Sequence, residues 1–227
     1  MSFATLALLA AALAAPERPV IYAALGDSTG VGVGAGNDGG YVRRIAERLR
    51  REGRKVQLAN LCVSGARVAD VIEGQLPLLA AYEPELVTVG IGINDVTNGT
   101  PPAVFEKLYG ELLDRLAATG AQVVVLEVPD LSLSPLAQGE AARLGIRGRV
   151  EAVNAAIHAA AARHGFAVAG LFRESQEELP GHPELLCEDR FHPSKRGYDR
   201  WAEALWPVVV RAVGAAGEPL PSEPARQ

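Results

Sequence analysis

Four short segments of the sequence carry side chains whose types suit acyl transfer. Ser28 follows Gly-Asp, Gly65 follows a serine, and Asn94 lies within Gly-Ile-Asn-Asp. Asp189 precedes His192 by three residues, and this spacing within one loop can place a carboxylate against the imidazole Nδ1. A hydroxyl, a glycine turn, a side-chain amide and an Asp–His pair together supply a nucleophile, a base, a group that orients the base, and oxyanion donors. These residue types therefore favour acyl-transfer chemistry if the fold brings them together.

Hydrophobic periodicity predicts the elements that would position these residues. Short apolar runs bounded by glycine, proline or polar residues predict five strands, at residues 20–25, 56–63, 86–91, 122–128 and 166–169. Apolar residues at helical spacing predict five helices, at residues 41–51, 68–76, 102–118, 147–163 and 195–213. Because nearly wholly apolar strands alternate with helices, we expect an α/β fold whose parallel sheet is covered on both faces.

The four segments lie where such a sheet binds its ligands, beyond the carboxyl ends of the strands. Ser28 follows the first predicted strand, Gly65 the second and Asn94 the third. The Asp189–His192 pair precedes the last predicted helix. We therefore expect all four segments to meet at one edge of the sheet.

In this order, and spread over most of the chain, the four segments resemble the SGNH hydrolase superfamily, the GDSL-type esterases and lipases. This resemblance implies a three-layer α/β/α sandwich with a flavodoxin-like, five-stranded parallel sheet, in agreement with the strand pattern. Thr29 departs from the family, because many members have leucine at this position, which does no chemistry. The matching pieces are Gly26-Asp27-Ser28, Gly65, Gly92-Ile93-Asn94-Asp95 and Asp189-x-x-His192-Pro193.

The resemblance also implies a role for each matching residue. Ser28 would be the nucleophile, His192 the general base, and Asp189 the residue that orients His192. The Ser28 N–H, the Gly65 N–H and the side-chain amide of Asn94 would form the oxyanion hole. The implied activity is hydrolysis of carboxylic esters of small or medium acyl groups, with no cofactor and no metal. The alternative is a catalytically inactive module that binds an acylated or carbohydrate ligand.

The substrate class stays open at this stage. A small-molecule ester, a lipid ester, an acyl-thioester and an acetylated carbohydrate all suit the family. Residues 130–145 follow the fourth predicted strand and form the largest expected wall of the pocket. Three leucines between residues 131 and 136 favour an apolar acyl or alkyl group, although leucines in a loop also pack without binding anything.

Composition and charge argue against several other functions. The chain has 227 residues, of which 48% are hydrophobic, so it can bury a full core without disulfides or bound metals. Lys and Arg number 22 against 27 for Asp and Glu, and the net charge of −5 argues against nucleic-acid binding. Residues 30–35 match a G-x-G-x-x-A pattern, but they do not form the tight turn between strand and helix that dinucleotide binding requires.

The remaining histidines and the two cysteines do not predict a metal site. His158 and His164 are six residues apart in a helix, which suits surface or packing roles, and His182 belongs to a solvated turn or the rim of the cleft. Cys62 and Cys187 are too few for a disulfide scaffold. If the protein is exported, a bridge could join them, and otherwise both are small buried hydrophobes.

The two ends of the chain differ in composition from the rest. Residues 3–15 are mainly apolar and contain Ala12-Leu13-Ala14, a small-x-small pattern that favours a signal peptide. No basic residue precedes them, and a packed N-terminal helix is the alternative. Thirteen residues are too few to span a bilayer. Residues 217–227 hold three prolines and no apolar period, which predicts a disordered tail. Between the ends we find no repeat and no linker, so we expect one hydrolase domain over residues 18–214.

Overall fold

The computed structural model describes residues 18–215, and its centre is a five-stranded sheet in the order β2-β1-β3-β4-β5. Every neighbouring pair of strands is parallel, which confirms the predicted fold class. The strand order reverses at β1, and the crevice at such a reversal is the usual ligand site of an open α/β sheet. The strands are β1 (Val20–Gly26), β2 (Val56–Asn60), β3 (Leu86–Gly90), β4 (Gln122–Leu126) and β5 (Ala167–Ala169).

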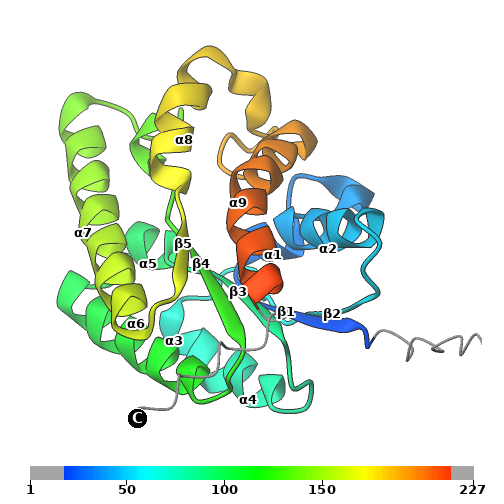
Figure 1. Ribbon diagram of the computed structural model, residues 1–227. Helices are drawn as coiled ribbons and strands as arrows, with labels where there is room; N and C mark the ends of the chain where they lie inside the picture. Colours follow the sequence, from blue (N-terminus) through cyan, green and yellow to red (C-terminus); the bar gives the residue numbers. More distant parts are fainter. Residues whose placement is uncertain (1–17, 216–227) are drawn as a thin grey trace, which may run out of the picture.

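Helices cover both faces of the sheet and complete the three layers (Figure 1). On one face α2 (Tyr41–Arg51) packs beside α9 (Lys195–Ala215), and both bury apolar side chains against the strands. The opposite face is covered by α6 (Pro102–Ala117), α7 (Glu140–His164) and the helical segment over residues 68–79. The two faces have separate apolar clusters, as expected for a sheet that is buried on both sides.

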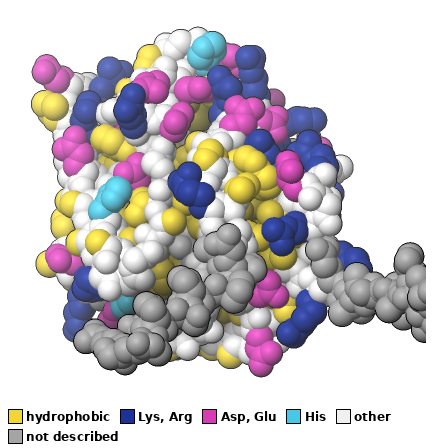
Figure 2. Space-filling model, viewed as in Figure 1, with side chains coloured by type: hydrophobic (Ala, Val, Ile, Leu, Met, Phe, Trp, Pro, Cys, Tyr) yellow, Lys and Arg dark blue, Asp and Glu magenta, His cyan; other side chains and the backbone are white. Residues whose placement is uncertain are grey.

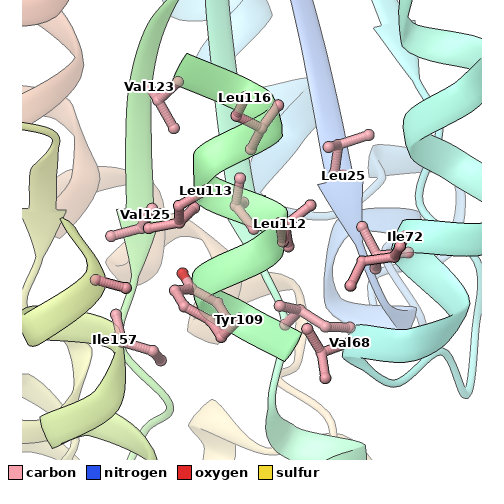
Figure 3. Close-up of a cluster of buried hydrophobic side chains, with 14 of the residues drawn as sticks. Leu25, Val68, Ile72, Tyr109, Leu112, Leu113, Leu116, Val123, Val125 and Ile157 are labelled. Carbon is pink, nitrogen blue, oxygen red and sulfur yellow. The ribbon is translucent and has the colours of Figure 1, made fainter. Parts of the chain in front are cut away.

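The apolar stripe of α6 shows how sequence pattern produces this packing (Figure 3). Tyr109, Leu112, Leu113 and Leu116 recur at helical spacing, are fully buried, and face the strands. Val125 of β4 lies opposite them in the same cluster. Each fully buried leucine stabilises the fold by roughly 1.5–3 kcal/mol.

The predicted elements differ from the structure mainly at their ends. The predicted strand at 56–63 ends at Asn60, and the one at 122–128 ends at Leu126, because the later residues belong to loops that approach the candidate site. The helix predicted at 68–76 is three consecutive pieces that continue to residue 79. These pieces are α3 (Val68–Asp70), the π-helical turn η2 (Val71–Gln75) and α4 (Leu76–Leu79).

One predicted helix begins earlier in the structure, and several short elements were not predicted. The seventh helix begins at Glu140 instead of residue 147, so part of the expected 130–145 wall is helical. Residues 140–145 are exposed on every side, and they therefore lack the apolar period by which a helix is recognised. The other additions are short: α1 (Ser28–Val31), α5 (Ile93–Thr97), α8 (Leu171–Glu178), and the 3-10 turns η1 (Gly36–Asp38), η3 (Leu131–Leu133), η4 (Leu179–Gly181) and η5 (Pro183–Leu185).

The surface carries charges of both signs. On the face shown in Figure 2, basic side chains are scattered among acidic ones instead of gathering in one patch. Within residues 18–215, no helix is long and apolar enough to cross a membrane. The predicted signal segment at 3–15 and the predicted tail at 217–227 both lie outside the described residues.

Candidate active site

Ser28, His192 and Asp189 form a continuous row of hydrogen-bonded side chains. The Ser28 Oγ lies 2.8 Å from the Nε2 of His192. The Nδ1 on the other side of the imidazole lies 2.6 Å from the Asp189 Oδ2. The chain therefore brings together a hydroxyl and a carboxylate that are 161 positions apart, and the imidazole lies between them.

The local structure of one loop holds the Asp189 carboxylate in place. Its Oδ1 accepts the backbone N–H groups of Phe191 at 2.8 Å and of His192 at 2.9 Å. Partial burial would by itself raise the pKa of Asp189, but the hydrogen bonds from His192 and Phe191 outweigh it and hold the pKa well below its usual range. Asp189 is therefore a stable anion beside His192.

Ser28 is the first residue of α1, and only Asp27, the N-cap of that helix, separates it from β1. Its N–H lies in the first helical turn, where backbone N–H groups have no carbonyl partner within the helix. The turn from strand to helix needs glycine at position 26, because the φ of Gly26 is +157° and a Cβ there would lie 2.4 Å from the Gly90 carbonyl oxygen. In the Gly-Asp-Ser segment, the glycine therefore allows the turn, and the serine supplies the hydroxyl.

Asn94 and Gly65 are brought together at the ends of β3 and β2. The Asn94 Nδ2 donates to the carbonyl of Ala66, the residue after Gly65, at 3.0 Å. The φ of Gly65 is +83°, a conformation that favours glycine. A second bond links the two loops, because the Asp95 Oδ2 accepts the Val68 N–H at 3.1 Å. All the candidate site residues therefore lie at the carboxyl edge of the sheet.

The environment of Asp27 is a feature that the sequence did not predict. Asp27 is fully buried, and its Oδ1 accepts the N–H of Thr29 at 2.9 Å and the Thr29 hydroxyl at 2.8 Å. Among the described residues, the Oδ2 has no hydrogen-bond partner. Burial raises the pKa of Asp27 to about 6, even though the bonds from Thr29 act in the opposite direction.

Two further side chains, Gln75 and Arg44, hold backbone segments near the site by hydrogen bonds. Gln75 forms a pair of 2.8 Å bonds with the N–H and the carbonyl of Gly26, and so fixes the end of β1. Arg44 is buried on α2, bonds Asp199 at 2.6 Å, and donates to the carbonyls of Gly39 and Lys195. A charged residue on the apolar face of the 41–51 helix is a pattern that could have revealed Arg44 from the sequence.

The other histidines lie away from the site. His158 contacts Glu127 at 2.6 Å, His164 contacts Asp114 at 2.8 Å, and His182 contacts Glu184 at 3.1 Å. His182 is exposed in its turn and is not among the residues that line the cavity beside His192. Within residues 18–215, no group of His, Cys, Asp or Glu is arranged to hold a metal ion.

The two described cysteines are both free thiols, so the hypothesis of a bridge between them is wrong for this structure. The Cys62 thiol packs over Gly30, where an added Cβ would lie 2.3 Å from its sulfur. The Cys187 thiol instead points to Asp189 and donates to the Oδ1 at 3.1 Å. The two sulfurs have different neighbours and different roles in packing.

Comparison with known proteins identifies the family of this chain. A sequence model of the GDSL-like Lipase/Acylhydrolase family matches residues 24–200, which include every candidate site residue. The chain belongs to this family. It is accordingly an ester-hydrolysing enzyme of the SGNH/GDSL type, and the predicted resemblance is confirmed.

Individual GDSL-like relatives cover most of the chain. Esterase TesA of Pseudomonas aeruginosa is 28% identical over 185 residues, which are 82% of this chain and 85% of that protein. An arylesterase of Vibrio mimicus is 27% identical over 120 residues, which are 53% of this chain and 58% of the relative. The crystal structure of TesA has a TM-score of 0.68 and 26% identity, and the match covers 85% of this chain and 99% of that one.

Proposed function

We propose that this protein hydrolyses carboxylic esters of small or medium acyl groups through an acyl-enzyme on Ser28. The observation that supports this most strongly is the row of contacts from the Ser28 Oγ through His192 to Asp189. In the first step the Oγ attacks the carbonyl carbon of the ester, and its proton passes to the Nε2 of His192. A new bond joins the Oγ to the acyl carbon, and the carbonyl oxygen takes up the negative charge.

His192 next acts as an acid, and the alcohol leaves to complete formation of the acyl-enzyme. The bond between the acyl carbon and the alcohol oxygen breaks, and His192 gives its proton to that leaving oxygen. Water then attacks the acyl-enzyme, with His192 again as the base, and releases the acid and the free Ser28 hydroxyl. Asp189 holds the imidazole tautomer and stabilises the imidazolium throughout.

The oxyanion would be bound by the N–H groups of Ser28 and Gly65 and by the side-chain amide of Asn94. A side-chain amide has two N–H donors. One of those of Asn94 bonds the Ala66 carbonyl, which fixes the direction of the amide and leaves the second for the substrate. Donors that are fixed before the reaction stabilise developing charge without reorganising, and this is a large share of catalysis in acyl transfer.

Turnover of p-nitrophenyl acetate by the purified protein tests this proposal. We expect release of p-nitrophenol by the wild type and a loss of at least about 10³-fold in kcat for the Ser28→Ala variant. A folded wild-type protein that releases no product would support the inactive binding module instead. Equal rates for the two proteins would place the nucleophile elsewhere, with Ser64 the next residue to test.

We also propose that the protein is exported, with residues 3–15 as a signal segment. The apolar run and its Ala12-Leu13-Ala14 pattern support this. Mass spectrometry of the mature protein from fractionated cells is the test. Cleavage after residue 14 or 15 is the expected result, and a full-length protein in the cytoplasmic fraction would contradict it.

A further inference from the structure

An apolar cavity lies beside His192, between α8 and α9. Of these two helices, α8 follows the end of β5, and its neighbour α9 lies along one face of the sheet (Figure 1). Most of the side chains that line the cavity are hydrophobic, and charged groups stand among them on the two helices, including Glu174 and Arg200. The apolar lining includes Leu131, Leu171, Leu179, Phe191, Trp201 and Ala204.

Hydrogen bonds made by the polar residues of the lining hold the walls of this cavity in fixed positions. At the β4 end, the Asp130 N–H donates to the Ser175 Oγ at 2.8 Å, and Gln176 donates to the Asp130 carboxylate at 2.9 Å. Between the two helices, Arg200 of α9 bonds Glu178 of α8 at 2.8 Å. The cavity is therefore braced on both sides, and an apolar group would enter it without first having to order the walls.

The position of the cavity relative to the reacting atoms indicates which part of an ester would enter it. His192 lines the cavity together with Thr29 and Ile93, whereas Ser28, Gly65 and Asn94 themselves are not among the described residues that line it. The acyl carbon and its oxygen would lie among those last three residues. The alcohol oxygen must instead lie within hydrogen-bond reach of the His192 Nε2, which returns the proton to it. The group attached to that oxygen starts beside the cavity.

We propose that this cavity binds the alkyl or aryl part of the leaving alcohol, and so selects esters of apolar alcohols. This inference rests on the proposed ester hydrolysis and adds a substrate class to it. Several polar groups of the lining already bond protein partners, as Arg200 does with Glu178 and Asp130 with Ser175 and Gln176. A sugar alcohol would therefore place most of its hydroxyl groups against leucine and tryptophan side chains, where they would lose hydrogen bonds to water with little replacement. An acetylated carbohydrate is thus disfavoured as a substrate. Of the three leucines in the predicted 130–145 wall, Leu131 lines this cavity, whereas Leu133 and Leu136 do not.

Two matched series of esters test the inference by kinetics. In acetates of linear alcohols from methyl to hexyl, we expect kcat/KM to rise by up to about fourfold for each methylene that is buried. In methyl esters of acids of the same lengths, we expect a smaller dependence on length. A steeper dependence in the acid series, or a rate for an acetylated sugar above that for hexyl acetate, would overturn the inference.

A variant that fills the cavity separates this effect from general damage. Ala204→Phe adds a ring inside the cavity, and we expect the ratio of kcat/KM for hexyl acetate to that for methyl acetate to fall close to one. Val210→Phe is the matched control, because Val210 lies on the same helix, is exposed, and does not line the cavity. We expect the control to keep the wild-type ratio. An unchanged ratio in a folded Ala204→Phe variant would contradict the inference.

A binding measurement that needs no turnover distinguishes a failure of this inference from a failure of the proposed reaction. Trp201 lines the cavity, and Trp206 is the other tryptophan of the chain. In a Ser28→Ala, Trp206→Phe protein, we expect hexan-1-ol to change the Trp201 fluorescence in a saturable way, and glucose to have no effect. The added Ala204→Phe change should abolish the response. No saturable response to hexan-1-ol would overturn the inference even if the wild-type protein hydrolyses esters.

Discussion

The Cys187 thiol donates a hydrogen bond to the Asp189 Oδ1 at a sulfur–oxygen distance of 3.1 Å. The carboxylate that contacts the imidazole therefore receives a side-chain donor in addition to the two backbone N–H groups of its own loop. The Cys187 N–H also bonds the His192 carbonyl at 2.9 Å. Cys187 thus touches both members of the Asp–His pair without reaching the reacting atoms.

This contact makes Cys187 a positioning residue for the pair. In Cys187→Ala the carboxylate loses one donor, and we expect kcat/KM to fall by roughly threefold to tenfold, as for the loss of one modest hydrogen bond. Cys187→Ser keeps a donor and should retain most of the activity. Steady-state kinetics of both variants on one ester checks this. Equal rates for the alanine variant and the wild type would show that the thiol only fills space.

Asp27 should make stability depend on pH in the direction opposite to most carboxylates. Its folded pKa of about 6 lies above the ordinary value of 3.8, so between these values the folded state binds more protons than the unfolded state. The free energy of unfolding should therefore fall as the pH rises from about 4 to above 6, by roughly 3 kcal/mol from this group.

Asp27→Asn removes this titration and is the test. The unfolding free energies of both proteins are measured by urea denaturation at pH 4 and at pH 7. Relative to the wild type, the variant should be more stable at pH 7 than it is at pH 4. Comparison of the two proteins cancels the contributions of all other groups. A difference that is the same at both pH values would contradict the raised pKa.

Arg44 should stabilise the fold well beyond an ordinary surface ion pair. Arg44→Ala leaves the carbonyls of Gly39 and Lys195 without their donor, and we expect a loss of about 2 kcal/mol in the free energy of unfolding. The neighbouring Arg43 forms an exposed pair with Glu47 at 2.9 Å. Arg43→Ala should change stability little, because exposed pairs contribute little. Urea denaturation of the two variants compares them, and equal losses would refute the bracing role of Arg44.

Asn94 and Asp95 should respond differently to substitution although they are adjacent. If the Asn94 amide donates to the oxyanion, Asn94→Ala lowers kcat by roughly 10²–10³ with little change in KM. Asp95 is buried and accepts the Val68 N–H, so Asp95→Ala should mainly lower the thermal midpoint. Kinetics and thermal unfolding of both variants decide the matter. An Asn94→Ala enzyme with an unchanged kcat would remove Asn94 from the mechanism.

The sequence predicts the parts of this protein that depend on local periodicity. The helix at 41–51 agrees with the structure at both ends, because Tyr41, Ile45 and Leu49 repeat at helical spacing and Gly53 follows. The segments around Ser28 and Asn94 are predicted because each follows a short apolar run, and His192 because it precedes a periodic helix. The eighth helix was missed, since its eight residues are mostly polar and carry only a short buried face.

Contacts between distant segments are not visible in local patterns. The pairing of Arg44 with Asp199 joins residues 155 positions apart, and that of Gln75 with Gly26 joins residues 49 positions apart. Neither spacing belongs to a sequence pattern from which the contact could be predicted. The burial of Asp27 likewise depends on its position at the end of β1, where the sheet and the loops close around it.

The central claim is that Ser28 is the nucleophile of an ester hydrolase. Intact-protein mass spectrometry after treatment with an organophosphonate tests this most directly, because the reagent reacts with a serine activated by an adjacent base. We predict one adduct on the wild type, located on Ser28 by peptide mapping, and none on a folded Ser28→Ala variant. An adduct that persists on Ser28→Ala, or that maps to another residue in the wild type, would contradict the account.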